Sequence, residues 1–135
     1  MGAKPSAAEL QRLALAREVA GLDGDAWPRA VHAVAAAYAS DGELPRAVHR
    51  AWLASRGDKT AILALAWARE QLRLGLEGVI AATPPSARGV LALPAETLAW
   101  LVLAACEALA YEPPSAAPDR VRLLLELTGR GAPPA

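Results

Sequence analysis

The segment of residues 93–111 constrains the fold more than any other part of this sequence. It reads LPAETLAWLVLAACEALAY, and its many Ala and Leu residues have high helix propensity. Pro94 suits a first helical turn, Glu96 favours the positive end of the helix dipole, and Pro113 ends the helix. Apolar residues cover more than one stripe of this helix, whereas a surface helix needs only one. We therefore expect a helix that is covered on at least two sides.

Two kinds of cover fit this helix, and the sequence leaves both open. It is either the central core helix of a small bundle, or a core helix whose outer face is also a dimer seam. A membrane span is not expected, because the apolar run is shorter than the roughly 20 residues that a span needs. Glu96 and Glu107 also interrupt it.

Composition places the chain in the all-α class as a single domain. A length of 135 residues is within the range of one domain with a sizeable core. Phe is absent, and Ala and Leu supply most of the 54% apolar content, which favours helices over strands. Cys106, the one cysteine, falls within the most apolar segment, so we expect a small buried hydrophobe there.

Charge and the beginning of the chain limit the possible partners and location. Lys and Arg number 14, and Asp and Glu also number 14, so the chain lacks the positive charge that nucleic-acid binding requires. We expect no DNA or RNA contact by this chain alone. No long apolar run follows Met1, so no signal peptide is predicted and the cytoplasm is the expected location.

Capping residues and apolar spacing predict about six helices. Ser6 and Glu9 form a capping-box pattern at the start of a helix that ends near Gly21. The other helices are expected at about residues 25–38, 45–57, 58–82, 93–111 and 118–129. No strand, internal repeat or long linker interrupts them. The chain is thus predicted to be one helical bundle over residues 1–135, with residues 131–135 as a disordered tail.

The usual catalytic and metal-binding patterns are missing from the sequence. It contains no glycine-rich phosphate loop, no H-E-x-x-H and no C-x-x-C. His32 and His49 lie on different predicted helices and would need an acidic partner from a third to hold a metal ion. Glu70 and Glu77 share one helix face with Arg73 between them, a spacing that favours ion pairs over acid–base catalysis. We expect neither an enzyme nor a bound metal or cofactor.

Aromatic residues give the clearest indication of a ligand. Tyr38, Trp52 and Trp67 lie on three consecutive predicted helices whose other core positions are mostly Ala and Leu. Such rings either fill gaps in a packed core or line an apolar cavity, and both interpretations stay open. Trp67 precedes Gln71 by four residues, so both project from one helix face, and a buried glutamine needs hydrogen-bond partners. The predicted pocket is lined by Tyr38, His49, Trp52, Trp67 and Gln71.

Three segments of the sequence resemble the C-terminal regulatory domain of TetR-type transcriptional regulators. They read KTAILALAWAREQLRLGLEGVIAA, LPAETLAWLVLAACEALAYEPP and PDRVRLLLELTGRG. In that family a long helix ends in a Gly-containing turn, a loop follows, and two final helices complete the domain. Residues 6–56 fit the family's linking helix and the two shorter helices after it, so the likeness spans about residues 6–130.

The resemblance implies a ligand-sensing domain that forms a homodimer. In the family the last two helices pair with their symmetry mates in a four-helix bundle, and the earlier helices enclose a pocket for a small molecule. Together with the two-sided apolar helix, this places the dimer contacts at Leu98, Leu101, Val102, Ala105, Leu109 and Leu124.

Two points in this interpretation stay open. Family members carry a three-helix DNA-reading module before the linking helix, and only five residues precede Ser6 in this sequence. We therefore expect any DNA contact to come through a module that this sequence lacks. The pocket is expected to take a small apolar ligand, and the alternative is a helical interaction or scaffold module that binds no ligand.

Overall fold

Six α-helices form one all-α domain in the described part of the chain. The computed structural model describes residues 4–89 and 92–129. The helices are α1 (Ala7–Ala20), α2 (Ala26–Ala37), α3 (Glu43–Ala54), α4 (Lys59–Ala82), α5 (Ala95–Ala108) and α6 (Ala117–Glu126), with 3₁₀ turns η1 (Pro85–Ala87) and η2 (Leu109–Tyr111). The predicted fold class is confirmed. The disordered tail expected at residues 131–135 lies outside the described residues.

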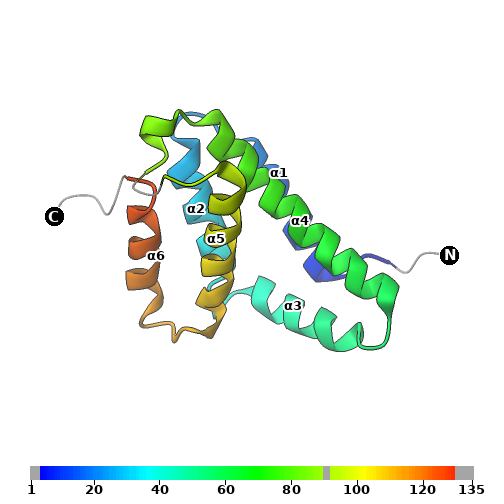
Figure 1. Ribbon diagram of the computed structural model, residues 1–135. Coiled ribbons are helices and arrows are strands. Elements are labelled where there is room, and N and C mark those ends of the chain that lie inside the picture. Colours follow the sequence, from blue (N-terminus) through cyan, green and yellow to red (C-terminus); the bar gives the residue numbers. More distant parts are fainter. Residues whose placement is uncertain (1–3, 90–91, 130–135) are drawn as a thin grey trace.

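The long helix α4 is the frame on which the other helices pack. α1 lies beside it and runs in the same direction, and Gly75 lets the two backbones approach closely (Figure 1). α2 and α5 pack against each other and against α4, and α6 packs on α2. α3 reaches from the end of α2 back to the beginning of α4, so it spans the open side of the bundle.

Capping residues in the sequence determine where several helices begin. At α1 the Glu9 N–H donates to Ser6 Oγ (3.2 Å), and the Ser6 N–H donates to Glu9 Oε1 (3.3 Å), which is the predicted capping box. At α4 the Ala61 N–H donates to Asp58 Oδ1 (3.1 Å). The helix expected at residues 93–111 is shorter than predicted, because α5 tightens into the 3₁₀ turn η2 after Ala108.

The core lies between α1, α2, α4 and α5. Its largest fully buried side chain is Trp27, whose indole Nε1–H donates to the backbone carbonyl of Arg88 (2.7 Å). Cys106 is also fully buried, and burial raises the pKa of its thiol to about 12, as expected for a small protonated hydrophobe. Other fully buried side chains are Val19, Val31, Val34, Leu72, Leu76, Ile80, Leu98, Val102 and Leu103.

The side of α4 that faces away from this core is also apolar. Leu63, Trp67 and Leu74 are exposed, and at 100° per residue they project opposite the buried Leu65 and Leu72. None of the helices in residues 4–89 and 92–129 combines the length and apolar character needed to cross a bilayer. The exposed stripe is therefore a feature of the surface of α4.

Two glycines allow the loop after α4 to touch the end of α6. Gly89 has a φ of 110° and Gly129 a φ of 79°, a region that side chains rarely adopt. A Cβ added at Gly89 would lie 1.8 Å from the carbonyl oxygen of Leu127, so no side chain fits there. This contact joins two segments that are far apart in the sequence.

Gly89→Ala is expected to destabilise the fold more than the same change at a glycine with free space around it. The positive φ costs about 1–2 kcal/mol and overpacking typically adds about 1–3 kcal/mol to the loss in free energy of unfolding. Gly24→Ala is the control, because Gly24 has a φ of 65° but nothing within 4 Å of the added Cβ. Urea denaturation measures both. Equal losses would contradict the close contact with Leu127.

Candidate functional site

Arg12 on α1 is an arginine inside the core of the bundle. It is only 6% exposed. Its Nε–H donates to the hydroxyl of Tyr38 (3.3 Å), and Nη1 donates to the backbone carbonyl of Leu65 (3.2 Å). A buried charge costs free energy unless an opposite charge neutralises it, so Arg12 requires an acidic partner.

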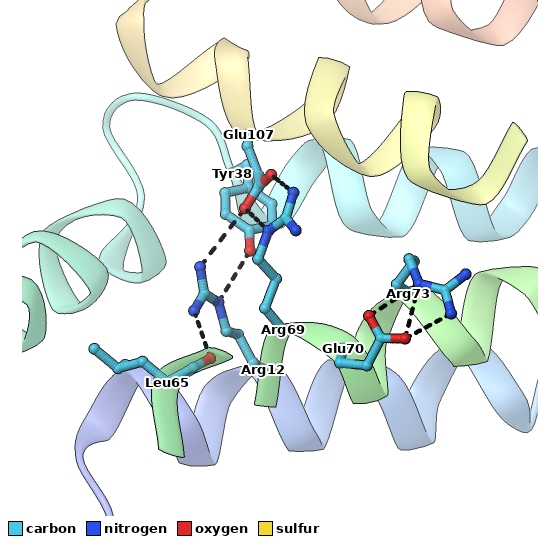
Figure 2. A network of polar contacts seen from close by, with 7 residues as sticks. All are labelled: Arg12, Tyr38, Leu65, Arg69, Glu70, Arg73 and Glu107. Carbon is cyan, nitrogen blue, oxygen red and sulfur yellow. Dashed lines mark hydrogen bonds and ion pairs between the residues drawn. The ribbon is translucent and has the colours of Figure 1, made fainter. Parts of the chain in front are cut away.

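Glu107 on α5 supplies this opposite charge. Its Oε2 lies 3.6 Å from Nη2 of Arg12. Arg69 on α4 binds the same carboxylate through two hydrogen bonds, from Nε to Oε2 (2.8 Å) and from Nη2 to Oε1 (2.6 Å) (Figure 2). The hydrogen bond to Glu107 is the main cause that raises the pKa of Arg69 above its ordinary value. One carboxylate thus connects α1, α4 and α5.

Tyr38 completes the cluster from α2. Burial raises the pKa of its hydroxyl above the ordinary value, although the neighbouring Arg12 acts in the opposite direction. The hydroxyl therefore stays protonated at neutral pH and accepts a hydrogen bond from Arg12. With two guanidinium groups and one carboxylate, the cluster has a formal charge of +1.

This polar cluster forms the floor of a cavity of about 690 Å³. Small-molecule sites typically measure roughly 300–1,000 Å³ and combine apolar walls with a few polar groups. The cavity fits that description, because α3 and α4 supply its walls and the side chain of Trp52 lies 63% exposed at its edge. The apolar lining residues are Pro45, Val48, Trp52, Leu53, Ile62, Leu65, Ala66 and Ala110.

The cavity brings together Tyr38, His49 and Trp52 of the five predicted pocket residues. Trp67 and Gln71 do not line it, so the predicted pocket is corrected at these two positions. Both project roughly 200° around α4 from Arg69, which reaches the cavity, and Trp67 is 57% exposed. Their four-residue spacing indicates a shared face of α4, but it does not indicate which face the other helices cover.

Sequence reasoning did not identify Arg12, Arg69 or Glu107 as site residues. Arg12 lies four residues after Ala8 and three before Leu15, which are both buried, so its spacing is that of a core residue. Glu107 lies within the most apolar segment of the chain. Charged residues at core positions need oppositely charged partners, and this requirement could have paired Arg12 with Glu107.

The other polar residues considered in the sequence form ordinary ion pairs. Arg73 Nη2 lies 2.6 Å from Glu70 Oε1, and Arg73 Nη1 lies 3.7 Å from Glu77 Oε2, as their spacing on α4 predicts. His32 and His49 are exposed. Within residues 4–89 and 92–129, no three His, Cys, Asp or Glu side chains gather in a way that could hold a metal ion.

A larger cavity, of about 1,060 Å³, lies at the other end of α4. It is lined by the turn between α1 and α2, the last turns of α4 and the loop after it. Its charged lining residues, Asp23 and Asp25, are both exposed. The smaller cavity is the better candidate because buried charged groups from four helices converge on its floor.

The residues predicted for the dimer interface divide into two groups. Leu98 and Val102 are completely buried within one chain, so their predicted place in an intersubunit contact is corrected. They fall on the side of α5 that faces α2 and α4. Leu101 is 38% exposed. The remaining three, Ala105, Leu109 and Leu124, line an apolar groove of about 470 Å³ between α5 and α6.

The floor of the 690 Å³ cavity is suited to binding more than to proton transfer. The guanidinium groups of Arg12 and Arg69 stay protonated at any ordinary pH, and the raised pKa of Tyr38 keeps its hydroxyl neutral. No protein-family model, curated protein or solved structure matches this chain. Function is therefore inferred from the cavity and from the arrangement of the helices.

Tyr38→Phe is expected to lower the free energy of unfolding by about 1–3 kcal/mol, because it leaves a buried N–H of Arg12 without an acceptor. Tyr111→Phe is the matched control, since Tyr111 is 90% exposed and its hydroxyl is free to bind water. That change is expected to stay within about 0.5 kcal/mol of the unaltered protein. Chemical denaturation of both variants tests this. Equal stability would mean that the Arg12–Tyr38 hydrogen bond makes no net contribution.

Proposed function

We propose that this chain is the small-molecule-sensing and dimerisation domain of a TetR-type transcriptional regulator. The observation that carries the proposal is the cavity of about 690 Å³ with apolar walls and a buried charged floor. The order of the helices also supports it, since the long α4, a loop and the final pair α5 and α6 follow the pattern that the resemblance implies.

The floor of the cavity offers a physical route from ligand to response. Arg12 belongs to α1, which corresponds to the helix that links the sensing and DNA-reading parts in the family. Glu107 belongs to α5, one of the two helices proposed to form the dimer. A ligand that binds one arrangement of these helices better than another shifts the population toward it. Contact with the floor would thus change how α1 sits against α5.

Trp52→Ala is expected to weaken binding of small apolar compounds by roughly tenfold or more, because aromatic anchors often dominate binding energy. Its effect on stability is expected to stay within about 0.5 kcal/mol, since the ring is largely exposed in the free protein. Trp67→Ala is the matched control, as Trp67 is similarly exposed and lies outside the cavity. A panel of apolar compounds, followed by tryptophan fluorescence and calorimetry, provides the measurement. Equal binding by the two variants would exclude this cavity as the ligand site.

The proposed homodimer uses the α5–α6 groove. The groove is almost entirely apolar, and its neighbours Leu101 and Leu123 are exposed large side chains. Two-fold pairing of the two helices with those of a second copy would cover these residues and form a four-helix bundle. Leu98 and Val102 would then support the interface from within the core.

Leu101→Glu is expected to convert the dimer into a monomer, because it would bury an unpaired charge at a cost of several kcal/mol. Leu63→Glu is the control, since Leu63 is an exposed leucine on the outer side of α4. Analytical ultracentrifugation at tens of micromolar protein separates the outcomes. A monomeric unaltered protein contradicts the dimer, and dissociation by Leu63→Glu alone would place the contact on α4.

The alternative function is a helical interaction module that binds no small molecule. The exposed stripe of Leu63, Trp67 and Leu74 on α4 favours it, because such a face can pack against a partner helix. The two functions differ in what the cavity does. A module of this kind would bind none of the compounds in the panel.

A further inference from the structure

We infer that the 690 Å³ cavity selects an apolar carboxylic acid, whose carboxylate is bound by Arg69 in competition with Glu107. The inference rests on the proposed function and names the class of ligand. It follows from three properties of the floor: its net charge, the accessibility of its groups and the hydrogen-bond donors left over.

The net charge of the floor favours an anion. Among the described residues, Arg12 and Arg69 line the cavity together with one acidic side chain, Glu107. A single carboxylate therefore neutralises two guanidinium groups, and one positive charge remains in a partly buried site. A second carboxylate from a ligand would balance it, and charge-assisted hydrogen bonds to arginine are about twice as strong as neutral ones.

Accessibility identifies Arg69 as the group that a ligand meets first. The Arg69 side chain is 32% exposed, whereas that of Arg12 is 7% exposed and lies beneath it. The bidentate pair with Glu107 uses only Nε and Nη2 of Arg69. Because a guanidinium carries five N–H groups, the two of Nη1 and the second of Nη2 stay available for a ligand oxygen.

The same geometry disfavours an amine as the ligand. Both oxygens of Glu107 already accept hydrogen bonds from Arg69, and Oε2 also lies near Arg12. An amine would have to approach Glu107 beside two fixed positive charges. Away from the floor the lining is apolar, so the rest of the ligand is expected to be hydrocarbon.

Calorimetric titration with decanoic acid, decan-1-ol and decylamine tests the charge of the ligand at constant chain length. Decanoate is expected to bind roughly 10- to 100-fold more tightly than the alcohol, the range for hydrogen bonds to charged groups, and the amine more weakly than the alcohol. Equal binding of acid and alcohol, or preference for the amine, overturns the inference but leaves the proposed cavity intact. Failure of all three to bind overturns both.

Three variants test the assignment of Arg69. Arg69→Gln should weaken decanoate binding at least tenfold and leave decan-1-ol unchanged, whereas Glu107→Gln should tighten decanoate binding because it removes the internal competitor. Arg73→Gln is the matched control, since Arg73 lies one turn along α4 and pairs with Glu70 outside the cavity. Circular dichroism checks that each variant is folded. Similar losses for Arg69→Gln and Arg73→Gln, or unchanged affinity in Glu107→Gln, would contradict the proposed competition.

Discussion

The buried guanidinium of Arg12 is the constraint on which the arrangement of the helices depends. A charge in the core must be neutralised, and Glu107 can reach it only if α5 lies against α1 and α4. Arg69 binds both oxygens of that carboxylate from α4, and Tyr38 accepts a hydrogen bond from Arg12 on α2. Four helices therefore meet at one small group of charges, and the cavity opens directly above it.

The cavity exists because α3 packs less closely than the other helices. α1 and α4 approach each other at Gly75 and Ala16, where small residues allow contact between backbones. Among the residues of α3, by contrast, only Leu44 and Ala47 are buried. A helix with few buried apolar contacts is the one most easily displaced. We expect a ligand that contacts Trp52 to stabilise α3 more than any other helix.

The candidate site could be predicted from the sequence only in part. Tyr38, His49 and Trp52 were found because aromatic residues among alanines indicate either filled gaps or a cavity. Trp67 was misplaced because its spacing relative to Gln71 shows a common face without showing what covers it. The three charged residues of the floor were missed because each looks like a surface residue until its partners on other helices are known.

The sequence by itself determined the helices, since capping and helix propensity act within a few residues. Ser6 and Glu9 begin α1, Asp58 begins α4, and the apolar character of residues 93–111 places Cys106 in the core. Tertiary structure alone decided that the stripe containing Trp67 faces solvent. It also decided that Arg12 and Glu107, which are 95 positions apart in the chain, neutralise each other. The physical reason is range, because a helix forms from local hydrogen bonds, whereas the pairing of charges depends on how whole helices pack.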